Sequence, residues 1–454
     1  MRARVGVEMQ PAELDSLYVA HVADLERRFA RVLSDEGWDA VVIHSGSLIK
    51  RSRFDDQYWP MRPCPHFQHW VALADPDCFL VVRPGHRPAL ILGSPESFWE
   101  APRAPESNAH ESLFDVKRVV GGAQAKAHLP GGRVAFIGED CGRAAEWGMP
   151  ADAACPGSLV AALDALRTTR TAYEAACIAE ANRRAQAGHE ALRDAFRAGR
   201  ASELDLHLLF LRETSQDDPE TPYKNIVAMG RHAATLHHVA YGRPAPGRGA
   251  ESLLVDAGAT CRGYGSDVTR TWVRGEGAAA SVFAHLVALV DEMQQRLCAA
   301  IRVGVPYEDL HDESHRQVAA ILREVGVVRA SAEEAVASGV TRAFYPHGLG
   351  HSLGLQTHDV GCGLRLPRKN NAFLRNTSDV AVGQVLTIEP GIYFIDALLG
   401  PLRADPRAGK IVDYELLDAL APLGGVRIED DVMVLGAGIV NFTREHLPIG
   451  GGPV

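Results

Sequence analysis

The sequence has no long apolar run and no apolar segment at its start. Nowhere does it reach the roughly 18 consecutive apolar residues of a membrane-spanning helix, and Met1–Glu8 lacks the apolar core of a secretory signal. It also has no C-x-x-C pair among its 8 cysteines, no heptad pattern and no short repeat. These absences argue against a membrane protein, a disulfide framework and a solenoid. We therefore expect a cytoplasmic protein with reduced thiols and no membrane partner.

Positive charge is also scarce, with 47 Lys and Arg against 57 Asp and Glu and a net charge of -10. A nucleic-acid surface neutralises phosphates with excess positive charge, so we expect no nucleic-acid partner. The apolar content of 46% and the charged content of 23% are typical of a globular protein. A chain of 454 residues exceeds the size of one ordinary core, which indicates two domains.

The first part of the chain mixes helical and strand-like patterns. Apolar residues recur at helical spacing from Pro11 to Gly37. Strand-like runs follow at residues 39–44, 78–82, 88–92 and 133–138. These patterns predict a small α/β domain over residues 1–166. The polar and aromatic segment 51–60 favours a surface loop, with a role in an interface as the alternative.

A second domain is expected from residue 167 to residue 454. Thr171 and Glu174 have the spacing of a capping box, which predicts a helix that ends near Gly199, and Ser202–Asp205 caps another. Amphipathic helices are predicted at residues 280–301, 307–325 and 331–338. With the apolar strands between these helices, the whole chain is expected to be of the α/β (α+β) class.

The stretch 345–359 holds three imidazoles, those of His347, His351 and His358. The first two have the i, i+4 spacing of a zinc-binding helix, but the glycines between them disfavour a helix and no Glu follows His347 as HExxH requires. The glycine spacing also misses the dinucleotide-binding fingerprint by one residue. We interpret the stretch as a kinked strand in the wall of an active site. Ordinary surface or core histidines are the alternative.

Four acidic residues end or interrupt apolar strand-like runs. Asp256 ends one run, and Asp267 follows it after glycines that fit a hairpin, while Glu389 and Glu429 interrupt the runs 385–393 and 426–434. Burying a carboxylate is costly unless it is paired or bound to a metal. Together with one imidazole, these acids form an oxygen-rich donor set whose charge suits two divalent cations, with Mn²⁺ favoured. For each aspartate alone, an exposed strand end is the alternative.

The five residues Asp256, Asp267, His351, Glu389 and Glu429 lie in the motifs Asp-Ala-Gly, Ser-Asp-Val-Thr-Arg-Thr, Pro-His-Gly-Leu-Gly-His, Ile-Glu-Pro-Gly and Arg-Ile-Glu-Asp. In this order they resemble the dinuclear metal site of the pita-bread metallopeptidases, which include methionine aminopeptidase, aminopeptidase P and prolidase. The resemblance implies that Asp256 and Asp267 hold one ion. Asp267, His351 and Glu389 would bring the second ion, and Glu429 would bridge the two.

The resemblance covers nearly the whole chain. Segments 44–46, 54–60 and 221–228 are similar to bacterial Xaa-Pro dipeptidases related to organophosphorus acid anhydrolases. This similarity implies a pita-bread catalytic domain at residues 167–454, after an amino-terminal domain that serves dimerisation and access to the active site.

The same resemblance assigns roles around the metal site. His358 would donate a proton or stabilise the oxyanion, Glu389 would shuttle a proton, and His237 would contact the substrate. Further substrate-binding positions would be His347, Arg427, Arg375, Tyr223 and Asp56. One departure from the family pattern is His238, where an aromatic residue is expected.

The implied activity is hydrolysis of Xaa-Pro dipeptides by a hydroxide bridging two metal ions, with a side activity on organophosphate triesters. The resemblance also implies a homodimer in which Asp56 of one subunit reaches the active site of the other. One alternative is an aminopeptidase P acting on longer peptides, although its connection between the last two glutamates is usually shorter than residues 394–424 here. The other is a non-catalytic binding protein on the same fold, which would be expected to have lost metal ligands.

Overall fold

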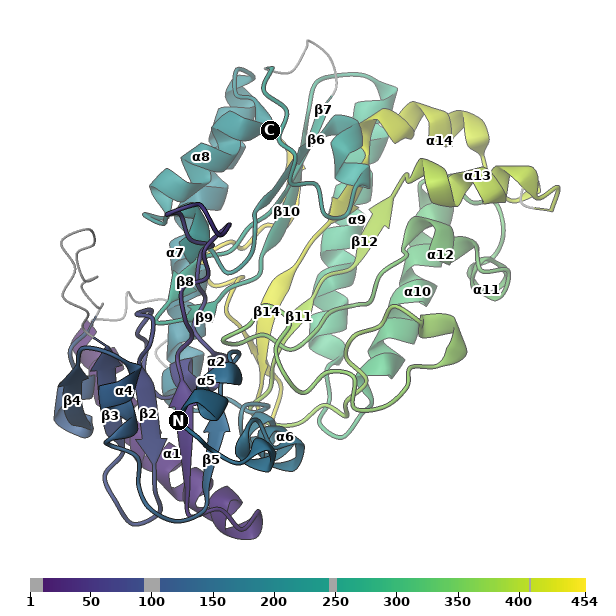
Figure 1. Cartoon of the computed structure of the whole chain (residues 1–454). Helices are drawn as coiled ribbons and strands as arrows, with labels where there is room; N and C mark the ends of the chain where they lie inside the picture. The colour runs from purple at the N-terminus through teal and green to yellow at the C-terminus, as the bar shows by residue number, and fades with distance from the viewer. Residues whose placement is uncertain (1–10, 94–106, 245–250, 408–409) are drawn as a thin grey trace. The chain divides into compact units, whose positions relative to one another are not determined.

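The computed structural model describes residues 11–93, 107–244, 251–407 and 410–454. The chain forms two compact units, an amino-terminal unit that ends at Cys177 and a carboxy-terminal unit from Ile178 to Val454. Helix α7 (Ala172–Ala198) runs from the first unit into the second (Figure 1). In the part of the chain that is described, no helix is both long enough and apolar enough to cross a membrane.

The amino-terminal unit is built on one mixed sheet with the strand order β4-β3-β2-β1-β5. Its strands are β1 (Ala40–His44), β2 (Phe79–Val82), β3 (Ala89–Gly93), β4 (Asp115–Val119) and β5 (Val134–Ile137). Its helices are α1 (Pro11–Asp35), α2 (Pro65–Gln68), α3 (His110–Leu113), α4 (Gly122–Lys126), α5 (Gly142–Glu146) and α6 (Gly157–Leu166). Strand β1 lies between an antiparallel and a parallel neighbour, so all of its residues are buried. The predicted strands are confirmed, but the sequence did not indicate β4, a polar edge strand without an apolar run.

Segment 51–60 lies on the surface of the amino-terminal unit, as predicted. The Phe54 side chain is 94% exposed and Trp59 is 57% exposed. Asp56 is exposed as well, and Gln57 Nε2 donates to its Oδ1 atom at 3.3 Å. Two exposed aromatic side chains, Phe54 and Trp59, therefore lie in the same surface segment as the Asp56 carboxylate.

The carboxy-terminal unit contains a four-stranded sheet, β16-β10-β7-β6, and a three-stranded sheet, β11-β14-β15, with smaller pairs β12-β13 and β8-β9. The strands before residue 300 are β6 (Ile226–Met229), β7 (Glu251–Asp256), β8 (Thr260–Cys261), β9 (Tyr264–Gly265) and β10 (Thr269–Arg274). The later strands are β11 (Val385–Ile388), β12 (Gly391–Tyr393), β13 (Gly425–Arg427), β14 (Asp430–Val434), β15 (Ile439–Asn441) and β16 (Gly451–Pro453).

Helices cover this unit on two sides. They are α8 (Glu203–Glu213), α9 (Ala278–Ala300), α10 (Tyr307–Glu324), α11 (Ala332–Ala337), α12 (Val340–Phe344), α13 (Asp396–Ala404) and α14 (Tyr414–Leu420), together with α7. One buried apolar cluster joins α7 and α8 to β6, β7 and β10, and a larger one joins α9 and α10 to β11, β13 and β14. The strands therefore lie between two helical layers, with α7 and α8 on one side and α9 and α10 on the other (Figure 1).

The helix starts follow the sequence closely. Ser202 and Asp205 form the predicted capping box, since the Ser202 side chain accepts from the Asp205 amide and the Asp205 side chain accepts from the Ser202 amide. Thr171 and Glu174 exchange the same pair of hydrogen bonds at the start of α7.

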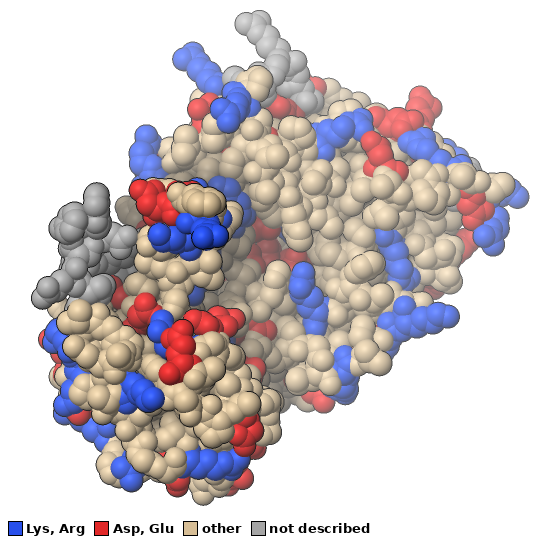
Figure 2. Space-filling view, viewed as in Figure 1, with Lys and Arg blue, Asp and Glu red and all other residues tan. Residues whose placement is uncertain are grey.

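On the face seen in Figure 2, side chains of both charges are interspersed.

Two expectations about strands are wrong. The runs 385–393 and 426–434 are not single strands: each divides into two short strands that belong to different sheets, with β11 pairing with β14 and β12 with β13. Pro390 helps to separate the first pair, because it has no N–H for a strand ladder. The stretch 345–359 is also irregular rather than a strand, with an isolated bridge at Ser352.

Candidate metal centre

Asp256 and Asp267 meet because β7 and β10 run antiparallel. Asp256 is the last residue of β7 and lies opposite Thr269, the first residue of β10. Asp267 precedes Thr269 by two positions, so the chain returns it to the same end of the sheet. The predicted hairpin is therefore confirmed, and both carboxylates are buried.

His351 is brought to the same place by backbone pairing with β11. The amides of Glu389 and Thr387 donate to the carbonyls of Leu349 and His351 at 2.8 and 2.9 Å. Gly350 permits this approach, because a Cβ atom there would lie 2.1 Å from the Thr387 carbonyl oxygen. The glycine that weakened a helical interpretation therefore serves close packing of two chain segments.

Glu389 and Glu429 both lie in breaks between short strands. Glu389 follows β11, and Glu429 lies between β13 and β14. The Glu429 amide donates to the Thr269 carbonyl at 3.1 Å, and Thr269 Oγ1 donates to Glu429 Oε2 at 2.6 Å. Because neither glutamate is part of a regular strand, its side chain is free to turn toward the aspartates.

The donor atoms form one cluster. His351 Nε2 lies 3.4 Å from Asp267 Oδ2 and 3.6 Å from Glu389 Oε1. One ligand atom each from Asp267, His351 and Glu429 lies within 4.8 Å of the others. Within the described residues, the structure therefore brings four of the five predicted ligands to one place, and Asp256 is close enough to Asp267 and Glu429 for their charges to interact.

Burial and neighbouring charges raise the pKa values of Asp256, Glu389 and Glu429, whereas the hydrogen bond and charge of His351 outweigh burial and lower the pKa of Asp267. Burial, with the charge of Asp267 against the opposing charge of Arg427, raises the pKa of Asp256 to about 6. Burial and the neighbouring aspartates raise the pKa of Glu389 to about 7, although His351 opposes the shift, and burial raises that of Glu429 well above its ordinary value. Burial alone would lower the pKa of His351, but the contacts with Asp267 and Glu389 raise it to about 9.

Divalent cations fit this donor set. Asp256 Oδ1 is buried and has no hydrogen-bond partner in the described part of the chain. Four crowded carboxylates cannot all be ionised in a buried site without cations, and the nearby positive groups are His351 and Arg427. The oxygen-rich composition, with one imidazole, suits Mn²⁺ or a similar hard cation.

Arg427 organises the centre from one side. Its Nη2 donates to Asp256 Oδ2 at 2.6 Å, its Nε to Thr269 Oγ1 at 3.1 Å and its Nη1 to the Tyr393 hydroxyl at 2.9 Å. The Tyr393 hydroxyl is also hydrogen bonded to His347 Nε2 at 2.8 Å. Sequence reasoning did not select Tyr393, although it ends the run 385–393 that Glu389 interrupts.

A second supporting network was also missed. Asp431 Oδ2 accepts from the Asp267 amide at 3.0 Å and from Asn182 Nδ2 at 2.8 Å. Thr443 Oγ1 donates to Asn182 Oδ1 at 2.7 Å. The consecutive acids after Glu429 gave a hint of this network, but its partner in α7 lies 249 residues away.

The predicted substrate-binding residues occupy different settings. The ring of His358 lies edge-on to His351, with centroids 4.3 Å apart. Burial first, then the charges of His351 and Arg375, lower the pKa of His358 to about 4, and His237 acts in the same direction. His358 is therefore neutral at pH 7, and Arg375 and His237 are close enough to act on it electrostatically.

His347 and Tyr223 border the carboxylates. His347 Nδ1 lies 3.7 Å from Glu389 Oε2, and burial followed by the charge of Arg427 lowers the pKa of His347 to about 3. Burial and then the charges of Asp256 and Asp267 raise the pKa of Tyr223. Asp56, by contrast, belongs to the amino-terminal unit.

Two models of known protein families match this chain. Residues 176–435 match the model of metallopeptidase family M24, and residues 16–165 match the model of the Xaa-Pro dipeptidase N-terminal domain. The chain therefore belongs to metallopeptidase family M24, in the branch that carries this amino-terminal domain. The expected pita-bread fold of the catalytic domain is confirmed.

Among similar proteins, two full-length relatives are Xaa-Pro dipeptidases. The chain is 40% identical over 440 residues to the Xaa-Pro dipeptidase of Marinobacter nauticus, an alignment that covers 96% of this chain and 100% of that protein. It is 36% identical over 443 residues to the Xaa-Pro dipeptidase of Pseudoalteromonas atlantica, covering 95% of this chain and 99% of the relative. The resemblance to Xaa-Pro dipeptidases is confirmed, whereas the relation to organophosphorus acid anhydrolases stays a prediction.

Solved structures share the fold at lower identity. Aminopeptidase PepP of Pseudomonas aeruginosa superposes with a TM-score of 0.71 at 22% identity, covering 94% of this chain and 97% of that one. Proline aminopeptidase P II of Yersinia pestis gives a TM-score of 0.70 at 22% identity, covering 93% and 96% of the two chains. These likenesses support the architecture.

Proposed function

We propose that this protein is a metal-dependent dipeptidase that hydrolyses Xaa-Pro dipeptides. The observation that carries the proposal is the buried cluster of Asp267, His351 and Glu429, with Asp256 and Glu389 beside it. Support for the substrate class comes from the full-length relatives, which are Xaa-Pro dipeptidases. A binding protein that had abandoned catalysis would not need these costly buried acids.

The proposed cofactor is a pair of divalent ions, with Mn²⁺ favoured by the oxygen-rich donors. Asp256 and Asp267 would hold one ion, Asp267, His351 and Glu389 the second, and Glu429 both. Ions bound there lower the pKa of water and polarise a carbonyl group, which is the chemistry that peptide hydrolysis needs near neutral pH.

The protein groups then supply proton transfer and electrostatic stabilisation. Glu389, whose Oε1 lies 3.6 Å from His351 Nε2 in the same cluster, is placed to take a proton and pass it to the leaving nitrogen of the Xaa-Pro bond. His358 is neutral at this pH, so an imidazole N–H can donate to the oxygen that becomes negative.

Substrate binding is proposed for groups around this centre. Arg375 offers an exposed guanidinium within electrostatic reach of His358, which suits the free carboxylate of a dipeptide. His237, His347 and Tyr223 would border the substrate. For Arg427, whose guanidinium contacts Asp256, Thr269 and Tyr393, we propose that substrate binding is combined with positioning of the metal ligands.

The domain roles are part of the same proposal. Residues 167–454 would form the catalytic domain, and residues 1–166 would serve dimerisation and access to the active site. The assembly would be a homodimer in which the amino-terminal domain of one subunit contributes Asp56 to the site of its partner. The exposed Phe54 and Trp59 beside Asp56 support a contact role for this segment.

One assay tests the activity. Protein reconstituted with Mn²⁺ is offered an Xaa-Pro dipeptide, the matching Xaa-Pro tripeptide and a phosphotriester, and kcat/KM is compared for the three. The proposal requires the dipeptide to be the best substrate. Preference for the tripeptide would instead indicate aminopeptidase P, and preference for the phosphotriester would make ester hydrolysis the main reaction. No metal-dependent turnover of any of the three would overturn the assignment.

A further inference from the structure

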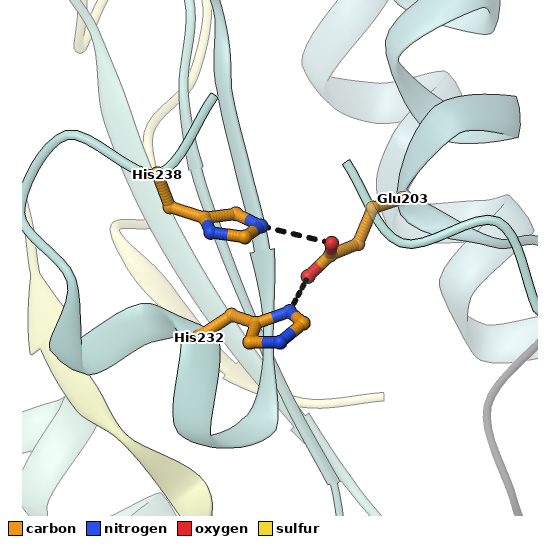
Figure 3. A group of neighbouring side chains, drawn as sticks. All are labelled: Glu203, His232 and His238. Carbon is orange, nitrogen blue, oxygen red and sulfur yellow. Dashed lines mark hydrogen bonds and ion pairs between the residues drawn. The ribbon is translucent and has the colours of Figure 1, made fainter. Parts of the chain in front are cut away.

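A second cluster of metal-ligand side chains lies in the carboxy-terminal unit, built from Glu203, His232 and His238. Glu203 Oε1 is 2.7 Å from His232 Nδ1, and Glu203 Oε2 is 2.9 Å from His238 Nε2. Both rings aim a nitrogen at the same carboxylate (Figure 3). None of the three residues belongs to the set that resembles the dinuclear metal site.

Three segments of the chain meet at this carboxylate. Glu203 begins α8, where the Ser202 capping box fixes the first turn, and His232 lies in the short helix Gly230–Ala234 after β6. The amides of Met229 and Gly242 donate to Glu203 Oε1 and Oε2 at 2.7 and 2.6 Å. The backbone bonds hold the carboxylate in place, so the site is preorganised before any ion arrives.

The charge of Glu203 has no strong counter-ion. Its side chain is 1% exposed, and in the described part of the chain its ion-pair partners are the two imidazoles, with no Lys or Arg among them. Although burial opposes ionisation, hydrogen bonds from the Met229 and Gly242 amides keep its pKa below the ordinary value. The carboxylate therefore presents a buried negative charge that a cation bound beside it would neutralise.

We propose that Glu203, His232 and His238 bind a single Zn²⁺ ion. One ligand atom from each residue lies within 4.8 Å of the others, and two imidazoles with one carboxylate form an established zinc donor set. The rings are stacked with centroids 4.4 Å apart, and each turns one nitrogen toward Glu203 (Figure 3). His232 has 54% of its side chain exposed, so solvent can reach the site and fill the remaining coordination position.

The donor set separates this site from the dinuclear centre. The dinuclear centre has four carboxylates and one imidazole, whereas this one has two imidazoles and one carboxylate, a composition that favours Zn²⁺ over Mn²⁺. To bind the ion, each imidazole must present an unprotonated nitrogen on the side that faces Glu203. A bound ion would link α8, through Glu203, to the segment that carries His237 and His238. The importance of this link for His237 rests on the proposed function, in which His237 borders the substrate.

The experiment measures zinc in the metal-loaded protein. Protein first saturated with Mn²⁺ receives one equivalent of Zn²⁺ and is passed through a desalting column, and both metals are counted by mass spectrometry. We expect about one Zn²⁺ per chain with Mn²⁺ retained. X-ray absorption at the zinc edge should show two histidine ligands, which the dinuclear centre cannot provide to one ion. No assay of peptide hydrolysis enters this test, so its failure is distinct from failure of the proposed dipeptidase.

Matched variants complete the test. His232→Ala changes a half-exposed side chain and His238→Phe keeps a ring in the stack, and each should weaken Zn²⁺ binding by more than about tenfold. His285→Ala is the control, because His285 forms an exposed pair with Glu324 at 3.2 Å and belongs to neither candidate metal cluster. Equal zinc retention in wild type and both site variants, or no zinc in the folded wild type, would overturn the proposal. The three side chains would then serve only to hold their segments together by hydrogen bonds.

Discussion

Arg427 and Asp256 form a buried ion pair across 171 positions of sequence, with 2.6 Å between Nη2 and Oδ2. The same guanidinium reaches Glu429 through Thr269 and His347 through Tyr393. One planar cation with several donors thus links two candidate metal ligands and one candidate substrate-binding residue. A lysine offers a single nitrogen and cannot make all three contacts.

Arg427→Lys should therefore weaken Mn²⁺ binding by about 10–100-fold, the range typical for groups that orient metal ligands. Tyr393→Phe, which removes one of the three contacts, should have a smaller effect. Metal affinity is measured by competition with a chelator. Mn²⁺ affinity in Arg427→Lys equal to that of the wild type would show that Asp256 does not depend on this ion pair.

Substitution of a candidate metal ligand should weaken metal binding more than substitution of Arg427 or Tyr393. Asp267→Asn or Glu429→Gln removes a charged oxygen donor from the buried cluster and should reduce both metal content and activity by at least about a hundredfold. Metal per chain after dialysis is the measurement. Glu415→Gln, on the exposed face of α14, is the matched control and should retain both. Two ions and ordinary turnover in either ligand variant would refute the ligand assignment.

The sequence predicted the composition of this centre better than its geometry. The apolar run into Asp256, the glycines that follow it and the return at Asp267 were enough to predict a hairpin, because turn chemistry and strand periodicity are local signals. Glu389 and Glu429 were predicted to interrupt their apolar runs, but the change of sheet at each position was not predicted, because an apolar run does not show which strand its residues pair with. Pro390 was the available signal.

Long-range partners were beyond sequence reasoning. The contacts of Arg427 with Asp256 and of Asn182 with Asp431 join positions 171 and 249 residues apart, and no periodicity connects them. Glu203 was noticed only as part of a helix cap, and His238 only as a departure from an expected aromatic. Their meeting depends on how α8 packs beside β6, which the sequence of neither segment specifies.

Metal binding should depend on pH in a defined direction. Without metal, the carboxyl groups of Asp256 and Glu389 have pKa values of about 6 and 7, so at pH 5.5 both retain protons that must leave before cations bind. Affinity for Mn²⁺ should rise between pH 5.5 and 7.5 and continue to rise toward pH 9, because His351, whose pKa is about 9, must also lose its proton to bind a cation. Titration calorimetry in two buffers of different ionisation enthalpy would count the released protons. Affinity that stays constant across this range would contradict the proposed competition.

The same shifts predict how metal removal affects stability. A carboxyl group whose folded-state pKa is raised stabilises the metal-free fold below its unfolded pKa of about 4, and this contribution is lost as pH rises through about 6 to 7. His351, raised to about 9, acts in the same direction at higher pH. The difference in Tm between Mn²⁺-loaded and chelated protein should therefore be larger at pH 8 than at pH 5.5. A difference that shrinks with rising pH would contradict the sign.

His358 should separate binding from turnover. It contacts the ring of His351 but is not in the donor cluster, so His358→Ala should keep metal content near normal and lower kcat by about 10²–10³-fold, as expected for a group that stabilises the transition state. Because its pKa is about 4, its protonation should not limit activity at pH 6. Loss of one ion from this variant would instead identify His358 as a ligand.

The last prediction concerns Asp56. A dipeptidase needs a group that recognises the free ammonium of its substrate, and a carboxylate in a partly desolvated site contributes about 1.5–3 kcal/mol through a charge-assisted hydrogen bond. Asp56→Asn should therefore lower kcat/KM for the dipeptide by about 10–100-fold while metal content and Tm stay unchanged. Asp55→Asn is the neighbouring control. In a solvated loop without this role, Asp56→Asn would change kcat/KM by less than about twofold.

A site completed by two subunits can also be rebuilt from two defective chains. In a heterodimer of Asp56→Asn with Glu389→Gln, one of the two active sites combines the intact Asp56 of one chain with the intact Glu389 of the other. Mixing the variants under conditions that exchange subunits should therefore raise activity above that of either parent, since each parent homodimer lacks one of the two groups in every site. Heterodimers are counted by native mass spectrometry with a mass tag on one variant. Activity that never exceeds the Asp56→Asn parent, in a mixture where heterodimers are abundant, would exclude a shared site and place the role of Asp56 within its own chain.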